Sequence, residues 1–207
     1  MSNLYDETYY RWGSTEISEA TYKCGYCGST VTSNEGMPLG DVLGSYVDSN
    51  LPQGVFICTN CKLPSFIYNG IQVPGVNFGN SVNNIPDNVN SVYEEARKSF
   101  SVGAYTGVIL LCRKLLMHVA VDFGADKNKN FFDYVNYLKD NHYVSQNSGE
   151  WIDSIRKFGN VATHQIEVNT KEDAERMIKF CEMLLKMNYE YPALMNQVNG
   201  STEEKKS

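Results

Sequence analysis

The sequence contains 207 residues, of which 42% are apolar and 20% are charged, and its formal net charge at pH 7 is −6. This composition is typical of globular domains and excludes a wholly disordered chain. Acidic residues outnumber basic ones, which excludes an extensive basic surface for nucleic acid, so any contact with RNA or DNA must be local. The sequence has neither an apolar run of the roughly 18 residues that cross a bilayer nor the pattern of a signal peptide, so we expect a cytoplasmic protein.

The first 70 residues have the pattern of a small β module. Short apolar runs at residues 54–57 and 65–68 are bounded by turn-forming residues, which is typical of strands. Aliphatic residues are too few in this part of the chain to build a core without help. A bound metal ion would supply the missing folding free energy.

Two C-x-x-C pairs, with 30 residues between them, lie in this module: Cys24, Cys27, Cys58 and Cys61. In an intracellular protein this pattern indicates metal binding before a disulfide. Two such turns place four thiolates at the corners of a tetrahedron, the geometry of closed structural zinc sites. A redox-active pair would open a helix in a βαβ unit, and neither pair does so. We therefore expect a four-cysteine zinc ribbon that holds structural Zn²⁺.

The sequence leaves open what the zinc ribbon binds. Residues 1–85 contain three basic and seven acidic residues, which disfavours nucleic acid. Aromatic residues are frequent from Tyr5 to Tyr26. They either form a stacking surface for bases or cover a small core.

The second part of the chain has helical periodicity. Residues 71–85 are polar and rich in Gly and Asn, so we expect a linker there. The helices expected from apolar spacing cover residues 86–100, 102–123, 131–140, 149–158 and 170–191. Gly124 is expected to end the second helix, Thr170 and Asp173 to form a capping box, and Pro192 to stop the last helix.

These elements predict an α+β fold. A zinc-ribbon module at residues 1–70 would precede a helical bundle at residues 86–192, and a polar tail would follow at residues 193–207.

A polar constellation lies between Trp151 and His164. If this segment is one helix, Arg156, Asn160 and His164 are spaced i, i+4, i+8 and face the same way. Such a set suits phosphodiester cleavage, in which Arg stabilises negative charge and His moves a proton. The alternative is a buried network that ties two helices together, or a helix that breaks at Gly159.

Residues 86–190 resemble the domain of unknown function 4145, a helical family of the HEPN-like superfamily. The matching segments are YEEA at 93–96, GAY at 103–105, LCRKLL at 111–116, IRKFGNVATH at 155–164 and DA at 173–174. The resemblance implies a helical bundle that is often dimeric, and in many members a metal-independent ribonuclease. It also implies a setting in bacterial or phage conflict and defence systems.

The ribonuclease motif is incomplete in this sequence. Gly159 stands where the superfamily has an Arg directly before Asn160, and Arg156 lies one helical turn earlier. Arg113 matches an Arg of the family's second helix and is a possible partner of the site, whereas we expect His118 to be structural. Two functions follow as hypotheses. The first is an interaction module that binds a partner protein, RNA or a nucleotide signal, and the second is an endoribonuclease that uses Arg156, Asn160 and His164, in either case with a possible homodimer.

Overall fold

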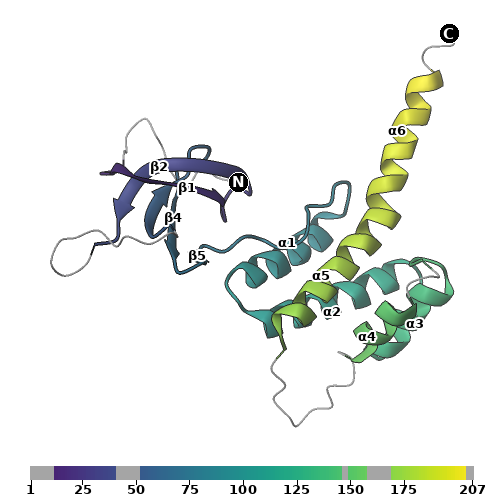
Figure 1. Cartoon of the computed structure of the whole chain (residues 1–207). Coiled ribbons are helices and arrows are strands. Elements are labelled where there is room, and N and C mark those ends of the chain that lie inside the picture. The colour runs from purple at the N-terminus through teal and green to yellow at the C-terminus, as the bar shows by residue number, and fades with distance from the viewer. Residues whose placement is uncertain (1–11, 41–51, 146–148, 158–168, 204–207) are drawn as a thin grey trace. The chain divides into compact units, whose positions relative to one another are not determined.

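The computed structural model describes residues 12–40, 52–145, 149–157 and 169–203. The chain divides into two compact units, Met1–Asn77 and Phe78–Ser207, and the division lies inside the segment predicted as a linker. The first unit is an antiparallel sheet and the second is helical (Figure 1). The predicted α+β fold class is therefore confirmed.

The sheet unit contains five strands in the order β1-β2-β3-β4-β5, each antiparallel to its neighbours. Their bounds are β1 Thr15–Lys23, β2 Thr30–Pro38, β3 Gly54–Ile57, β4 Pro64–Tyr68 and β5 Ile71–Val73. The last strand occupies the first three residues of the predicted linker. It pairs with β4 through a tight turn in which Asn69 and Gly70 both have positive φ, the conformation of a two-residue hairpin.

One face of this sheet carries a small core. Side chains alternate along a strand, so Ser65 and Ile67 of β4 are buried while Phe66 and Tyr68 are exposed. The buried residues of this core are Ala20, Tyr22, Cys24, Val31, Phe56, Cys58 and Ile67. Two of these seven residues are members of the C-x-x-C pairs, so the core of the sheet is continuous with the cysteine cluster.

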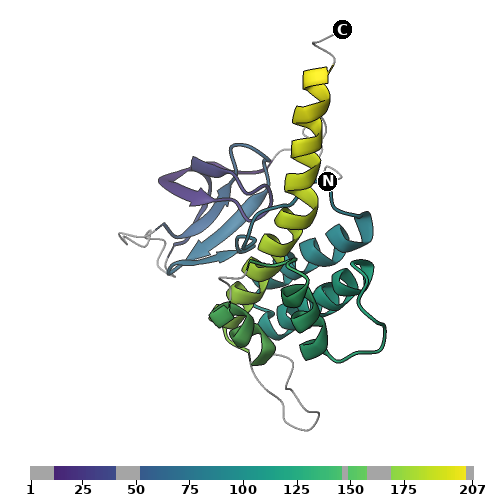
Figure 2. The same cartoon turned by 90° about the vertical axis from the view of Figure 1, so that its right-hand side faces the viewer.

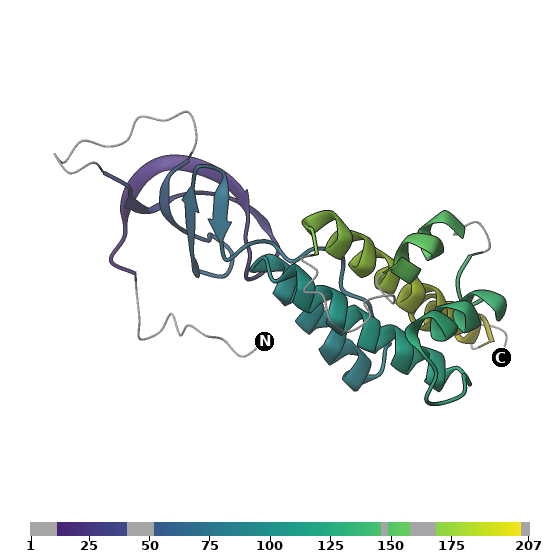
Figure 3. The same cartoon turned by 90° about the horizontal axis from the view of Figure 1, so that it is seen from below.

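The helical unit is built around α2. Its helices are α1 Asp87–Ser101, α2 Tyr105–Asp122, α3 Phe131–Asp140, α4 Gly149–Lys157, α5 Lys171–Leu185 and α6 Tyr191–Glu203, with a π-helical turn, η2, at Lys186–Glu190. Helix α2 packs against α1, α3 and α5, and Figures 2 and 3 show α1 and α2 side by side. Among the helices of the described residues, none combines the length and apolarity that crossing a membrane requires.

Local signals fix several helix ends as the sequence predicts. At the start of α5 the Thr170 hydroxyl accepts from the Asp173 N–H, and the Asp173 carboxylate accepts from the Thr170 N–H, which completes a capping box. After α2, Gly124 has φ +103° and its N–H donates to Val121 O, while the Ala125 N–H donates to Ala120 O. This is a Schellman motif, for which glycine is the favoured residue.

The prediction that Pro192 ends the last helix is wrong. The helix continues as α6 to Glu203, through residues predicted as a tail. The physical reason lies in η2, where the Tyr191 N–H donates to Lys186 O across five residues instead of four. This wider turn, directly before the proline, accommodates a residue that has no N–H to donate. Figures 1 and 2 show η2 and α6 extending α5 as one long helix.

Candidate metal centre and neighbouring surfaces

The two C-x-x-C segments form the same turn twice. In the first, the Gly28 N–H donates to Cys24 O at 2.9 Å, and in the second the Lys62 N–H donates to Cys58 O at 2.9 Å. Both residues that follow the second cysteine have positive φ, +73° at Gly28 and +59° at Lys62. These turns aim the cysteine side chains of each segment toward those of the other.

The four cysteine sulfur atoms lie within 4.8 Å of one another. The Sγ atoms of Cys24 and Cys61 are 3.7 Å apart, and those of Cys27 and Cys58 are 3.8 Å apart. A tetrahedral ion with metal–sulfur bonds of about 2.3 Å requires sulfur atoms about 3.8 Å apart, whereas a disulfide requires about 2.05 Å. All four residues are free thiols. The cluster is therefore shaped to bind a metal ion.

Hydrogen bonds support the thiolate form of Cys27, whereas burial raises the pKa of Cys24 and Cys61. Burial acts to raise the pKa of Cys27, but hydrogen bonds, first that from the Asn60 side-chain amide, outweigh it and lower the pKa to about 6. The Cys61 N–H also points at Cys58 Sγ, at 3.5 Å. Donors aimed at sulfur stabilise the negative charge that a metal-bound thiolate carries.

The face of the sheet opposite its core carries a row of apolar side chains. Direct cross-strand pairing joins Met37 to Val55, Val55 to Phe66 and Phe66 to Val73, so one row crosses β2, β3, β4 and β5. A second pair, Tyr68 and Ile71, lies beside this row. Val55 is half-buried and the other five side chains are exposed. We call these six residues the apolar platform. Sequence reasoning missed it because an apolar run reads the same whether one or both faces of a strand are covered.

The predicted catalytic residues fall largely outside the described part of the chain. Asn160 and His164 are not among the described residues. Arg156 belongs to α4, and its side chain is also outside the description. The fourth candidate, Arg113 of α2, places its guanidinium 5.1 Å from the centre of the Phe131 ring. The structure thus gives Arg113 a cation–π contact with α3.

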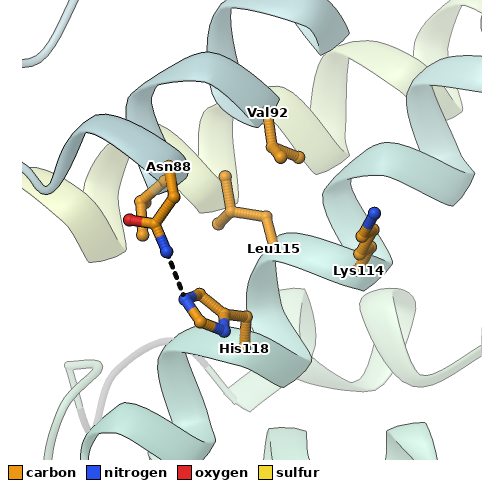
Figure 4. Close-up of a pocket in the computed structure, with 6 residues that line it drawn as sticks. Asn88, Val92, Lys114, Leu115 and His118 are labelled. Atoms are coloured by element: carbon orange, nitrogen blue, oxygen red, sulfur yellow. Dashed lines mark hydrogen bonds between the residues drawn. The ribbon is translucent and has the colours of Figure 1, made fainter.

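His118 lines a groove between α1 and α2 (Figure 4). Its Nε2 is 3.0 Å from the Asn88 amide nitrogen and 3.3 Å from the Asp122 carboxylate. Val89, Val92 and Leu115 also line the groove, whose volume is about 260 Å³. The Asn88 contact links α1 to α2, whereas Asp122 lies one turn along α2 itself.

Sequence reasoning also missed a buried polar network that fastens residues 78–81 to the helices. Arg97 donates to Phe78 O at 3.1 Å, Gly79 O at 2.9 Å and the Glu94 carboxylate at 2.6 Å. Glu182 accepts from the Asn80 backbone and side-chain amides. In the sequence these charged residues cannot be told from those of a solvent-exposed helix face, so the periodicity of the helices does not reveal that they are buried.

The comparisons with known proteins identify the helical unit. A family model described as "Domain of unknown function (DUF4145)" matches residues 94–203, just over half of the chain. The chain belongs to the DUF4145 family. No curated protein and no solved structure matches it. The DUF4145 match begins within α1 and ends at the last residue of α6, so α6 lies within the family domain.

Proposed function

We propose that this DUF4145 protein is a zinc-stabilised interaction module whose apolar platform binds a partner protein. The observation that carries the proposal is the cross-strand row of apolar side chains, which the strand pairing presents on one face of the sheet. Exposed apolar residues that are contiguous, in contrast to scattered ones, mark interaction sites. The strand pairing places these side chains next to one another without a partner.

Zinc is the ion that suits the cysteine cluster. Four thiolates are soft ligands, and they favour tetrahedral Zn²⁺ over ions that prefer oxygen, such as Mg²⁺ and Ca²⁺. Four protein ligands leave no open position for substrate, which is the arrangement of structural sites. When bound, the ion would hold β1–β2 and β3–β4 together through the two turns. Reduced thiols fit the cytoplasmic location that we propose.

Protein suits the platform better than nucleic acid. Residues 1–77 contain three basic and seven acidic residues, a charge of −4, which repels phosphate groups. The Phe66 and Tyr68 rings stack on each other, with centroids 6.3 Å apart. The part of the same face that β1 and β2 form is polar. There the Thr21 and Thr32 hydroxyls are 2.9 Å apart. The partner we propose is therefore an apolar protein segment flanked by Lys or Arg.

A site-specific crosslink tests this proposal. A photo-reactive phenylalanine analogue is placed at Val73 in the full, zinc-loaded chain, and a matched control carries it at Thr32 on the polar part of the same face. The partner that becomes crosslinked is identified and purified. Its affinity for the wild-type chain and for the Phe66→Ser and Ile71→Ser variants is then measured by calorimetry. We expect both variants to bind at least tenfold more weakly. Equal crosslinking at Thr32, or unchanged affinity, overturns the platform as the binding site.

The second candidate function is a HEPN-type endoribonuclease, which the Arg156, Asn160 and His164 pattern of the sequence favours. Cleavage of a fluorescent RNA by zinc-loaded protein in Mg²⁺-free buffer, measured beside His164→Ala, tests it. The interaction proposal predicts neither cleavage nor tight binding of the RNA. Cleavage that His164→Ala abolishes would instead establish the nuclease. It would also accord with the conflict or defence setting, in which expression slows growth and the variant relieves it.

A further inference from the structure

Helix α6 carries an apolar stripe on its exposed surface. Tyr191, Met195 and Val198 expose 52%, 60% and 63% of their surfaces, and Leu194 and Met187 are also exposed. At 100° per residue, the four residues of α6 lie within about 100° of one another, the width of the face that a helix buries against a partner. The stripe continues beyond the core, whose last buried residue along this helix is Leu185, with the partly buried Tyr189 packed against it.

The sequence of α6 is poorly suited to a helix that is exposed to solvent on all sides. From Asn196 onward it contains Asn, Gly, Ser and Thr, which have low helix propensity. Helix α5 supplies the nucleus for α6, but each of these residues costs free energy that only packing against another surface offsets. Among the described residues, α6 packs mainly against the adjoining η2 turn. The structure therefore calls for a surface that covers the stripe.

We infer that the covering surface is α6 of a second copy, in an antiparallel pair. The stretch Tyr191 to Thr202 has no charged residue, so two identical stripes meet without like-charge repulsion. In an antiparallel pair centred between Leu194 and Met195, the large Tyr191 lies opposite the small Val198, which fills the space evenly. A parallel pair would place Tyr191 against Tyr191 and Val198 against Val198.

The available area indicates a weak dimer. The five side chains expose between 37% and 63% of their surfaces, so at about 200 Å² for a large side chain they offer on the order of 500 Å² per copy. The pair would bury about 1,000 Å², the lower end for a specific interface. This inference does not depend on the proposed function. If both hold, the dimer presents two apolar platforms and binds a divalent partner with increased avidity.

Sedimentation velocity of the full, zinc-loaded chain over a range of micromolar concentrations tests the inference. We expect the weight-average mass to rise from that of a monomer toward that of a dimer. The double substitution Leu194→Asn and Val198→Asn should weaken association at least tenfold. Leu194→Met, which conserves the volume, should preserve it. The matched control is Val102→Asn, which changes a comparably exposed apolar residue outside α6.

Crosslinking tests the register. The Leu194→Cys variant should form an intermolecular disulfide under mild oxidation much faster than Tyr191→Cys, because only position 194 lies near the twofold axis. A wild type that stays monomeric at all concentrations, or a dimer that the double substitution leaves unchanged, overturns the inference. Equal crosslinking at both positions contradicts the antiparallel arrangement.

Discussion

The two units of this chain achieve a stable fold by different means. Within the described residues, the core cluster of the helical unit contains 27 buried residues, and that of the sheet unit contains seven, two of which are cysteines. Burial of apolar surface drives the folding of the first, whereas the second has too little of it to offset the conformational entropy of its chain. The comparison indicates that a metal ion held by the four cysteines would supply the stability that the small core of the sheet unit lacks.

This difference also separates what each unit leaves exposed. The sheet unit is a single layer, so one face carries the small core and the other presents the apolar platform. The helical unit wraps its helices around α2 and leaves apolar side chains exposed chiefly along the helix that leaves the bundle. Each unit therefore exposes a distinct apolar surface, to which we have assigned a partner protein and a second copy as proposals.

The largest effect is expected from Cys58→Ser. Loss of one of four thiolates should reduce the metal content from one ion per chain to nearly none, and the sheet should unfold with it, because the metal contributes roughly 10–16 kcal/mol to such folds. The helical signal in circular dichroism should persist. The matched control is Cys112→Ser, a buried cysteine of the helical core. This variant should retain the metal and lower the stability of the helices. A loss of metal in Cys112→Ser would contradict the assignment of the metal to the sheet unit.

A smaller effect is expected at Glu182, which fastens residues near Asn80 to the helical unit. Its carboxylate accepts from Asn80, and it also accepts from Lys179 at 3.1 Å and Lys186 at 2.8 Å. Glu182→Gln should lower the free energy of unfolding of this unit by about 2 kcal/mol, since it removes charge-assisted hydrogen bonds. Urea denaturation followed by the fluorescence of Trp151, in a Trp12→Phe background, measures this loss.

The same carboxylate gives the helical unit a dependence on pH. Burial acts to raise the pKa of Glu182, but hydrogen bonds from Lys186, Asn80 and Lys179 lower it to about 2, from an ordinary value of 4.5. The stabilisation is therefore complete above pH 4.5 and is lost as the pH falls from 4.5 toward 2. Repeating the urea series at about pH 6, 4 and 3 should show the advantage of wild type over Glu182→Gln shrink. A constant difference would contradict this assignment.

The smallest effect is expected at the two equivalent turn positions of the cysteine cluster. Lys62 has φ +59°, which costs an L-residue about 1 kcal/mol, whereas Gly28 holds the same conformation without that cost. Lys62→Gly should stabilise the sheet unit by a few tenths of a kcal/mol, and Gly28→Ala should destabilise it by about 1 kcal/mol. Thermal denaturation at fixed free zinc measures both. Effects of the same sign would show that the turns are not equivalent.

Much of the fold follows from local patterns in the sequence. Apolar spacing places α1 to α4 and the start of α5 within a few residues, and the Thr170–Asp173 capping box and the Gly124 C-cap each depend on neighbouring residues only. The C-x-x-C spacing likewise identifies the four cysteines that the structure brings together. These features are predictable because their physical causes lie within a few residues of one another.

The features that the sequence did not reveal depend on contacts between distant residues. The Arg97 and Glu182 network joins residues up to 102 positions apart, and charge alone does not distinguish it from a solvated face. The platform depends on strand register, which places Met37 and Val73 in one row. Helix α6 continues past Pro192 because of the η2 turn, which has no sequence signal of its own. The roles of Arg156, Asn160 and His164 remain predictions.

Hydrogen–deuterium exchange before and after zinc is removed tests the central claim most directly, since it reports on both units of the full chain at once. We predict that chelation abolishes the protection of amides in β1 to β4 and leaves that of α2 and α5 unchanged. Protection of the strands that survives complete removal of the metal would show that the sheet folds on its own core. That result would contradict the account.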